Sequence, residues 1–153
     1  LTIVLAASMP VINKLRDKNV ISETKDIFHQ LDNTIRTVIN EGPGSQRVRT
    51  IQINRGSFEI HDDAEFISWL METNYLESSP GVVIQEGNIE IYTYEDKFVV
   101  GKYWTSLNLT YDDSSIDLNF DGTSGVLSGR FNLVISNQGV VSDRTVINIE
   151  EKS

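Results

Sequence analysis

The spacing of apolar residues along the chain changes near residue 42. Before this point, apolar residues recur every three, four or seven positions, which places them along one face of a helix. Gly42 and Pro43 follow, and this pair commonly ends a helix. The sequence therefore predicts a helix over residues 1–41, whose apolar stripe contains Ile21, Phe28, Leu31, Ile35 and Val38.

The first twelve residues, LTIVLAASMPVI, are apolar on nearly every side of the predicted helix. Such a helix requires burial all round. At about 1.5 Å per residue, twelve residues reach roughly 18 Å, which is shorter than the ~30 Å hydrocarbon core of a bilayer. The segment is therefore expected to lie among other helices or to form part of a longer membrane span. An ordinary buried first helix of a globular domain is the alternative. Pro10 is expected to kink or weaken this helix.

After residue 44, short runs of alternating apolar and polar residues are separated by polar turns. Several strands with regular turn signals indicate a sandwich or small barrel. The predicted fold class is α+β, with a long N-terminal helix followed by an antiparallel, Ig-like or similar β-sandwich. Residues 1–41 are assigned to assembly or anchoring, and residues 42–153 to a β-rich head. The predicted strands are 46–53, 57–60, 65–71, 82–84, 89–94, 98–104, 107–111, 116–120, 126–136 and 140–149, with turns at 54–56 and 137–139.

Charge and cysteine content narrow the possible functions. The net charge is −9, and it arises entirely in residues 42–153, which hold eight basic and seventeen acidic residues. An acidic head repels nucleic acid, so nucleic acid is not expected to be a partner. The chain contains no cysteine, which excludes disulfides, thiolate metal sites and cysteine nucleophiles.

Catalytic chemistry has little basis in this sequence. The histidines are His29, within the predicted helix, and His61, beside Asp62 and Asp63 at a strand end. A His–Asp pair can serve as a general base, but no nucleophile motif accompanies it. We therefore predict no catalytic residues and no enzymatic activity.

Two short motifs could carry other functions. Asp117, Asn119 and Asp121 alternate before Gly122, as in the opening of a calcium loop, although Ser128 stands where the bidentate Glu is expected. The same letters describe a strand that ends in an Asp-Gly turn. Calcium is thus the one candidate cofactor. Asn108 begins an Asn-Leu-Thr sequon and is a candidate glycosylation site.

The order of these segments resembles that of archaeal type IV pilin-like proteins. The resemblance rests on LTIVLAASMPVI, on the amphipathic continuation that ends LDNTIRTVINEG, and on GPGSQRVRTIQINRGSFEI. The later segment SPGVVIQEGNIEIYTYEDKFVV is similar to the strand-rich heads of this family. The resemblance implies a processed class III-type signal, an N-terminal helix packed in a filament core or inner bundle, and a β-sandwich head that faces outward and is commonly glycosylated.

On this resemblance, the protein is expected to be a structural subunit of an extracellular, cell-surface filament, inserted in a membrane before assembly. Its partners are then other copies of the same chain. The alternative is a membrane-anchored accessory or adhesion module that does not self-assemble. The predicted assembly residues are the apolar residues of the helix, namely Leu1, Ile3, Val4, Leu5, Met9, Val11, Ile12, Leu15, Ile21, Phe28, Leu31 and Ile35.

Overall fold

The fold begins with a long helix, α1. The computed structural model describes residues 2–111, 115–121 and 123–152. Helix α1 spans Thr2–Glu41, a length of 40 residues, and the helix continues through Pro10. It ends where the sequence indicates: Gly42 has a φ of +88°, and its amide donates to the carbonyl of Ile39 at 3.2 Å. The Ser45 hydroxyl donates to the carbonyl of Val38 at 2.7 Å, so a side chain also satisfies the last turn.

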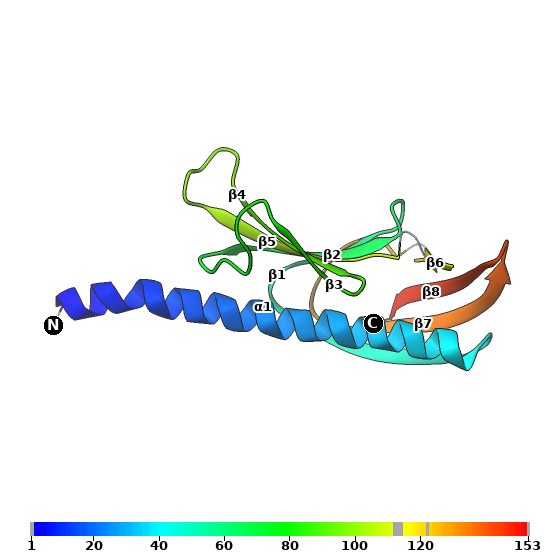
Figure 1. Ribbon diagram of the computed structural model, residues 1–153. Coiled ribbons are helices and arrows are strands. Elements are labelled where there is room, and N and C mark those ends of the chain that lie inside the picture. The colour runs from blue at the N-terminus through cyan, green and yellow to red at the C-terminus, as the bar shows by residue number, and fades with distance from the viewer. Residues whose placement is uncertain (1, 112–114, 122, 153) are drawn as a thin grey trace.

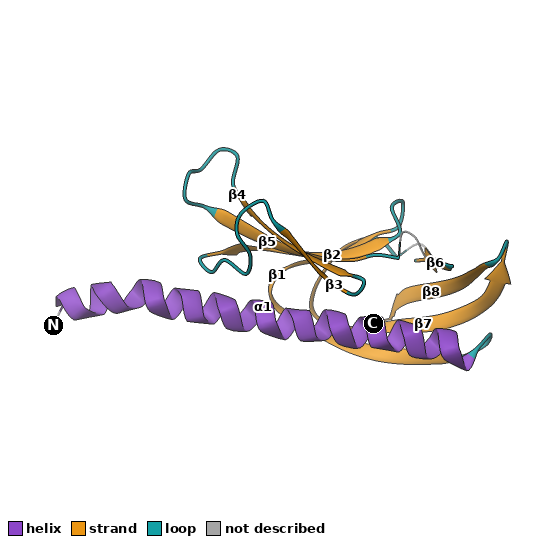
Figure 2. Cartoon of the chain, viewed as in Figure 1, coloured by secondary structure: helices purple, strands orange, loops and turns teal. Residues whose placement is uncertain are grey.

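Within the described residues, eight strands form one hydrogen-bonded sheet in the order β3-β4-β5-β2-β1-β7-β8-β6 (Figure 2). Neighbouring strands are antiparallel, except that β6 and β8 are parallel. The strands are β1 (Gln46–His61), β2 (Phe66–Thr73), β3 (Val83–Glu86), β4 (Ile89–Glu95), β5 (Tyr103–Leu109), β6 (Ile116–Asn119), β7 (Gly125–Val141) and β8 (Arg144–Lys152).

Strand β1 joins the two halves of the sheet. Its residues 46–53 pair with β7, and residues 57–61 pair with β2. Residues 58–60 also continue the pairing with β7, after a register shift between Ile53 and Phe58. Within this irregularity, Gly56 has a φ of +80°, and the indole of Trp69 donates to the carbonyl of Arg55 at 2.9 Å. The bulge bends β1, and the sheet curls (Figure 1). The turn predicted at 54–56 was wrong, because the chain continues through a bulge instead of reversing.

The C-terminal part of α1 packs against this sheet and shares its core. Phe28 meets Phe58 edge to face with ring centroids 5.8 Å apart, and Phe58 lies 5.3 Å from Phe131. The helix contributes its whole predicted stripe to the core, and each of those side chains is 0% exposed. The later turns of the helix therefore belong to the same packed body as the strands of residues 42–153.

The predicted strand 98–104 begins later than expected. Strand β5 starts at Tyr103, and residues 96–102 form a loop in which Phe98 and Val100 are each 94% exposed. The run of apolar residues Phe98, Val99 and Val100 indicated a strand here, but these side chains do not pack on the sheet. The prediction for 98–102 was therefore wrong.

The last hairpin also turns later than predicted. Strand β7 continues through 137–139 as an irregularity, and the chain reverses at Ser142 and Asp143, whose φ angles are +50° and +65°. Asn137 explains the shift, because its side chain donates to the carbonyl of Val38 at 3.2 Å and accepts from the amide of Gly139 at 2.9 Å. The turn predicted at 137–139 was therefore wrong.

The fold class is α+β, with one N-terminal helix and a mostly antiparallel, curled sheet over the described residues. The described strands belong to one continuous sheet. The two separate sheets that define a sandwich are therefore not seen as such in this sheet.

Candidate assembly surface

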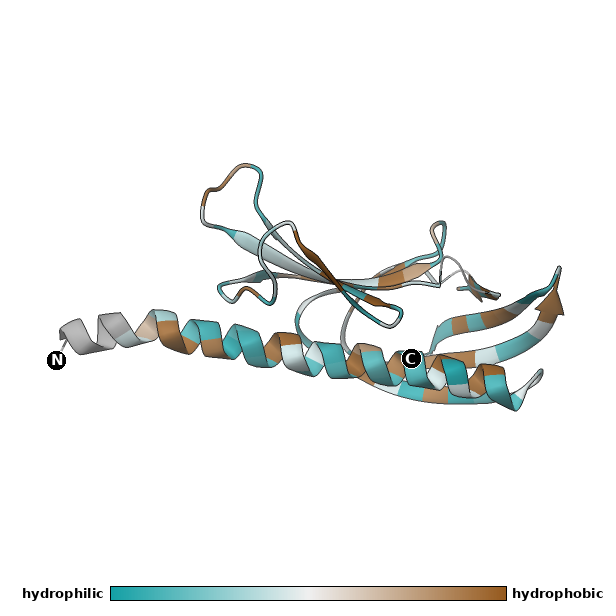
Figure 3. Cartoon of the chain, viewed as in Figure 1, coloured by the Kyte–Doolittle hydropathy of each residue, from teal (hydrophilic) through white to brown (hydrophobic). Residues whose placement is uncertain are grey.

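Helix α1 carries apolar side chains that the head leaves uncovered. Met9 is 54% exposed, Val11 58%, Ile12 45% and Leu15 56%. Counting about 100° per residue, Val11, Ile12 and Leu15 lie on the side of the helix roughly opposite to the stripe that packs on the sheet, and Met9 lies at the border between that side and the stripe. We call these four residues the back face. Figure 3 shows hydrophobic and hydrophilic stretches alternating along α1. Farther along, the same side of the helix is polar, with Asn19, Ser22, Glu23, Asp26, Asn33 and Thr37.

The predicted assembly residues divide into two groups in the structure. Ile21, Phe28, Leu31 and Ile35 are fully buried in the core of their own chain, so they have no surface left for a second copy. Their role is to hold the helix on the sheet. Among the described side chains, the predicted assembly surface is thus reduced to the back face. The backbone of Ile3, Val4 and Leu5 is helical, but their side chains and residue Leu1 lie outside the described part of the chain.

A buried carboxylate lies where the helix leaves the head. The side chain of Asp17 is 2% exposed and accepts from Arg55 Nη1 at 2.6 Å. It also accepts from the backbone amide of Asn74 at 2.7 Å and from its side-chain amide at 3.0 Å. Burial alone would raise the pKa of Asp17, but these hydrogen bonds outweigh it and leave the pKa below its ordinary value. Asp17 therefore joins the helix to the β1 bulge and to the loop after β2. We call these contacts the Asp17 latch.

A second helix carboxylate, Asp32, connects α1 to two loops of the head. It accepts from the hydroxyl of Tyr111 at 2.5 Å, from Asn88 Nδ2 at 3.1 Å and from Arg36 Nε at 2.9 Å. Burial, and then the neighbouring carboxylate, raise the pKa of Tyr111. The two carboxylates thus fix the helix to the head at points fifteen residues apart in sequence.

Between these two points, Lys25 lies 3.0 Å from both Glu77 and Glu86, and His29 Nε2 lies 3.0 Å from Glu86. The hydrogen bond from Lys25 is the main reason that the pKa of Glu86 is lowered. These groups are partly solvated, so each pair contributes little to stability on its own. Their effect is to add polar contacts between α1 and the β3 side of the head.

A groove opens between the helix and two loops, next to the Asp17 latch. It has a volume of about 570 Å³ and is lined by Pro10, Lys14, Asn74, Tyr75, Leu76, Gly101 and Tyr103. Leu76 is 41% exposed there. Pro10 and Lys14 lie on the head side of the helix, so residues 9–15 have uncovered surface on two sides: the back face and this groove.

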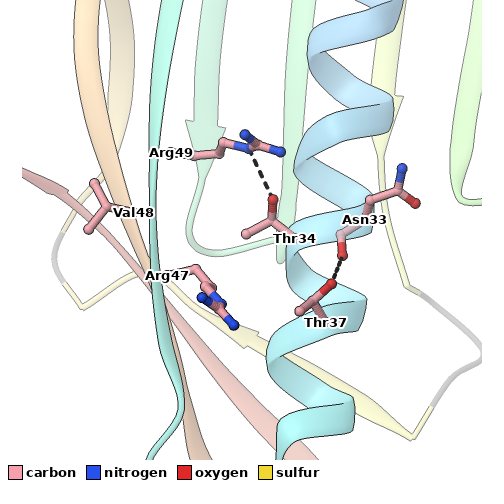
Figure 4. Close-up of a pocket in the computed structure, with 6 residues that line it drawn as sticks. All are labelled: Asn33, Thr34, Thr37, Arg47, Val48 and Arg49. Atoms are coloured by element: carbon pink, nitrogen blue, oxygen red, sulfur yellow. Dashed lines mark hydrogen bonds between the residues drawn. The ribbon is translucent and has the colours of Figure 1, made fainter.

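A smaller polar crevice of about 250 Å³ lies near the end of the helix (Figure 4). Arg47 and Arg49 reach from β1 toward Asn33, Thr34 and Thr37 on α1, whereas Val48 points to the other side of the strand. Arg49 Nε donates to the Thr34 hydroxyl at 3.1 Å, and Arg47 is paired with Glu41. The arginines thus extend the contact between helix and sheet beyond the apolar core.

The two histidines form contacts within the fold. His29 pairs with Glu86, as described. The ring of His61 stacks on Phe66 at a centroid distance of 4.1 Å, and its Nε2 lies 2.7 Å from the Ser68 hydroxyl. Asp62 and Asp63 belong to the turn after β1.

The calcium candidates lie at one edge of the sheet. Asp117 Oδ1 is 3.8 Å from Arg144, and Asn119 Oδ1 accepts from the amide of Asp121 at 3.2 Å. Gly122 is outside the described residues. Among the residues that are described, no group of three or more His, Asp or Glu side chains is placed to hold a metal ion. Calcium binding stays a prediction.

The sequon asparagine, Asn108, lies in the interior of the sheet rather than at an edge. It is on β5, opposite Ser68 of β2 and Glu90 of β4. Its neighbours Leu107 and Leu109 are buried, so the half-buried Asn108 is on the outer face of the sheet. Glycosylation of Asn108 stays a prediction.

Sequence reasoning missed the functional contacts of Asp17 and Asp32. Both are among the five acidic residues of 1–41, which equal the five basic residues in number. A signal was present, because both positions fall on the helix face that carries Ile21, Phe28 and Leu31. A carboxylate on an apolar face requires a buried partner.

No helix in the described part of the chain combines the length and the hydropathy needed to cross a membrane. Comparison with known proteins gives no match to a family model, to a curated protein or to a solved structure.

Proposed function

We propose that this protein is a structural subunit of an extracellular, type IV pilus-like filament on the cell surface. In this arrangement, the N-terminal turns of α1 pack in the filament core and the β-rich head faces outward. A sandwich-type head, as in the family that the sequence resembles, is part of the proposal.

The back face is the observation that carries this proposal. An apolar surface on the side of the helix away from the head is suited to contact with other helices. Burial of a fully exposed side chain such as Leu or Val contributes roughly 1.5–3 kcal/mol. The four side chains are about half exposed, so each has about half of that free energy to gain, and together they favour association. The polar continuation of the same side beyond Leu15 limits this contact to the first turns of the helix.

The charge distribution agrees with the same arrangement. Residues 1–41 carry equal numbers of basic and acidic residues, so close packing of helices meets no net repulsion. The excess of acidic residues lies in the head, where it keeps an outward surface hydrated. Before assembly, lipid would cover the back face in place of other helices. An Asn108 glycan, if attached, would lie on the outer face of the sheet.

Filament formation can be tested with three substitutions in the back face, Met9→Gln, Val11→Gln and Leu15→Gln. The whole 153-residue chain is purified, and pelleting over a concentration series is followed by electron microscopy. We expect ordered filaments from the unsubstituted chain and none from the triple variant, because its helices have lost three of the four apolar side chains of the back face.

The matched control replaces three exposed valines of the head, Val48, Val126 and Val140, with Gln; these are 60%, 62% and 65% exposed. This variant loses similar exposed apolar surface elsewhere and should still form filaments. A monodisperse monomer at every concentration of the unsubstituted chain would contradict self-assembly and favour the anchored accessory module. Equal loss of filaments in both variants would show that the back face has no special role.

A further inference from the structure

The loop of residues 96–102, between β4 and β5, exposes three consecutive apolar side chains to solvent. Phe98 and Val100 are each 94% exposed, and Val99 is 51% exposed. The loop projects from the end of the β4–β5 hairpin (Figure 1). Single exposed apolar residues are common on protein surfaces, but three in succession at the tip of a projecting loop form a patch that favours contact with an apolar phase.

Two carboxylates at the base of the loop bond to its backbone amides. Asp96 Oδ1 accepts from the amides of Phe98 at 2.8 Å and Val99 at 3.1 Å. Glu95 accepts from the amide of Gly101 at 2.7 Å. A backbone amide without a partner is costly in an apolar medium, so these bonds lower the cost of immersing the tip. They also order the loop, which reduces the conformational entropy that it loses on binding.

Amphipathic aromatic side chains surround the base of the same loop. Tyr92 and Tyr94 of β4 stack with ring centroids 5.4 Å apart. Tyr94 is opposite Trp104 of β5 in the sheet, and Trp104 Nε1 donates to Asp96 Oδ2 at 2.9 Å. Tyr and Trp, which have an apolar body and a polar end, are typical of the zone where a bilayer meets water. An apolar tip above an aromatic base therefore matches the layers of a bilayer surface.

The loop lies at the end of the head that faces the N-terminal turns of α1, whereas the β7–β8 hairpin lies at the opposite end (Figure 1). Gly101 of the loop and Pro10 and Lys14 of the helix line one groove, so the base of the loop stands beside these turns. In the proposed function, lipid covers the back face on the same turns before assembly. A bilayer in contact with these turns is then close to the loop as well.

We propose that the tip of the 96–102 loop inserts Phe98, Val99 and Val100 into the surface of a lipid bilayer. The proposal rests on the proposed function, because it concerns the membrane stage before assembly, and it adds a lipid contact on the head to that of the helix. A convex tip suits this partner, since lipids rearrange around an inserted side chain and need no preformed cavity to receive it.

The charges around the tip indicate which lipid surface it fits. Lys97 and Lys102 belong to the loop, and Glu95 and Asp96 lie at its base, so the local charges sum to zero. The whole chain carries a net charge of −9, which disfavours an anionic surface. We therefore expect insertion to depend on the apolar side chains and to occur at a neutral bilayer.

Site-specific fluorescent labels test this contact, because the chain contains no native cysteine. A nitrobenzoxadiazole dye, whose emission rises in apolar surroundings, is attached to Val100→Cys of the whole chain. The control carries the dye at Val140→Cys, whose residue is 65% exposed and belongs to the β7–β8 hairpin. Each chain is kept below its assembly concentration and mixed with vesicles of phosphatidylcholine alone or of phosphatidylcholine with phosphatidylglycerol.

We expect the emission at position 100 to rise and shift to shorter wavelength with phosphatidylcholine vesicles, and to be quenched by lipids brominated in their acyl chains. The emission at position 140 should stay unchanged. No change at position 100 with either vesicle would overturn loop insertion, and so would equal changes at both positions. A response that requires phosphatidylglycerol would overturn it too, because the lysines and not the apolar tip would then carry the contact.

A second variant checks the energetic role of the tip. Phe98→Ser combined with Val100→Ser should weaken partition of the whole chain into phosphatidylcholine vesicles by roughly tenfold or more, because two almost fully exposed apolar side chains are removed. Val48→Ser combined with Val140→Ser, at residues 60% and 65% exposed, should leave partition unchanged. The thermal midpoint without lipid should be the same for both variants. Unchanged partition of the loop variant would overturn the proposal.

Filament formation, measured without lipid, separates this contact from the proposed function. Filaments together with a lipid response at position 100 support both proposals. Filaments without the response overturn the loop contact alone. A response from a chain that forms no filaments overturns the proposed filament and keeps the loop contact. The absence of both overturns both.

Discussion

Replacement of Asp17 by Asn tests whether the Asp17 latch holds the helix on the head. The substitution keeps the size of the side chain and removes its charge. An Asn side chain keeps one acceptor oxygen and replaces the other with an NH2 donor, so either the bond from Arg55 or the two bonds from Asn74 lose their acceptor. The bonds that remain lose their charge-assisted strength. We expect the variant to fold, with a lower free energy of unfolding.

The magnitude follows from the burial of the two partners. Removing one member of a fully buried ion pair costs about 3–5 kcal/mol. Here the Asp17 side chain is 2% exposed, but Arg55 is 40% exposed and can be rehydrated. The cost should therefore be lower, and about 2 kcal/mol is consistent with the loss of hydrogen bonds to a charged group.

Urea unfolding, followed by tryptophan fluorescence, measures this change. Trp69 is 0% exposed and its indole bonds to the carbonyl of Arg55, so it reports on the bulge that the latch contacts. The midpoint should fall while the slope stays constant, because the surface exposed on unfolding is unchanged. Asp26→Asn is the control, since Asp26 is an exposed acid of the same helix, and it should shift stability by less than about 0.5 kcal/mol.

Acid pH provides a second measurement of the same latch. The folded-state pKa of Asp17 is depressed below its ordinary value of 3.8, so the carboxylate contributes stability above that value. This contribution is lost as pH falls through the lowered pKa. The difference between the unsubstituted chain and Asp17→Asn should thus be full at neutral pH and shrink below about pH 4. Equal midpoints for Asp17→Asn and Asp26→Asn at neutral pH would refute the reasoning.

Two further substitutions test other parts of the fold by the same urea assay. Gly56→Ala would place a Cβ 2.5 Å from Trp69 Nε1, whereas a Cβ at Gly44, which has a similar φ of +87°, would meet nothing within 4 Å. We expect Gly56→Ala to lower the free energy of unfolding by about 2 kcal/mol or more beyond the effect of Gly44→Ala. Equal effects of the two substitutions would contradict a tightly packed bulge. Tyr111→Phe removes the 2.5 Å bond to Asp32 and should cost about 2 kcal/mol. Because the pKa of Tyr111 is raised in the folded state above its ordinary value of 10.0, the unsubstituted chain should lose stability as pH rises above that value, and Tyr111→Phe should lose less; parallel pH profiles would contradict this.

Local patterns in the sequence predicted the elements whose structure depends on local contacts. The stripe of Ile21, Phe28, Leu31, Ile35 and Val38 lies in the core, as helical spacing indicates. The helix ends beside Gly42 because that residue adopts the positive φ that closes a helix. Most strand segments were also identified from alternation, since one face of each is buried.

Two of the errors, at 54–56 and 137–139, arose where distant residues decide between two local conformations. The letters around Gly56 suit a turn or a bulge, and the indole of Trp69 and the carboxylate of Asp17 favour the bulge. In the same way, Asn137 bonds back to Val38, which is 99 residues earlier, and moves the hairpin turn toward Ser142. A local sequence pattern cannot identify partners that lie so far apart in the chain. For the same reason, the sequence did not show which residues Asp17 and Asp32 contact.

In the proposed filament, Asp17 stands between the part of the helix that folds onto the head and the part that contacts other copies. On its C-terminal side, the apolar stripe is buried in the head and the opposite side is polar. On its N-terminal side, the back face and the groove are both uncovered, and Met9, Val11, Ile12 and Leu15 are each 45–58% exposed in the single chain. Removal of an exposed apolar side chain leaves no cavity in the core, so it should change the free energy of unfolding little. Substitutions in the back face should therefore abolish association between copies while the urea midpoint stays constant. Substitutions in the Asp17 latch should lower the urea midpoint and leave the apolar side chains of the back face unchanged. A back-face variant that unfolds markedly earlier than the unsubstituted chain would show that folding and assembly are not separated at this point of the helix.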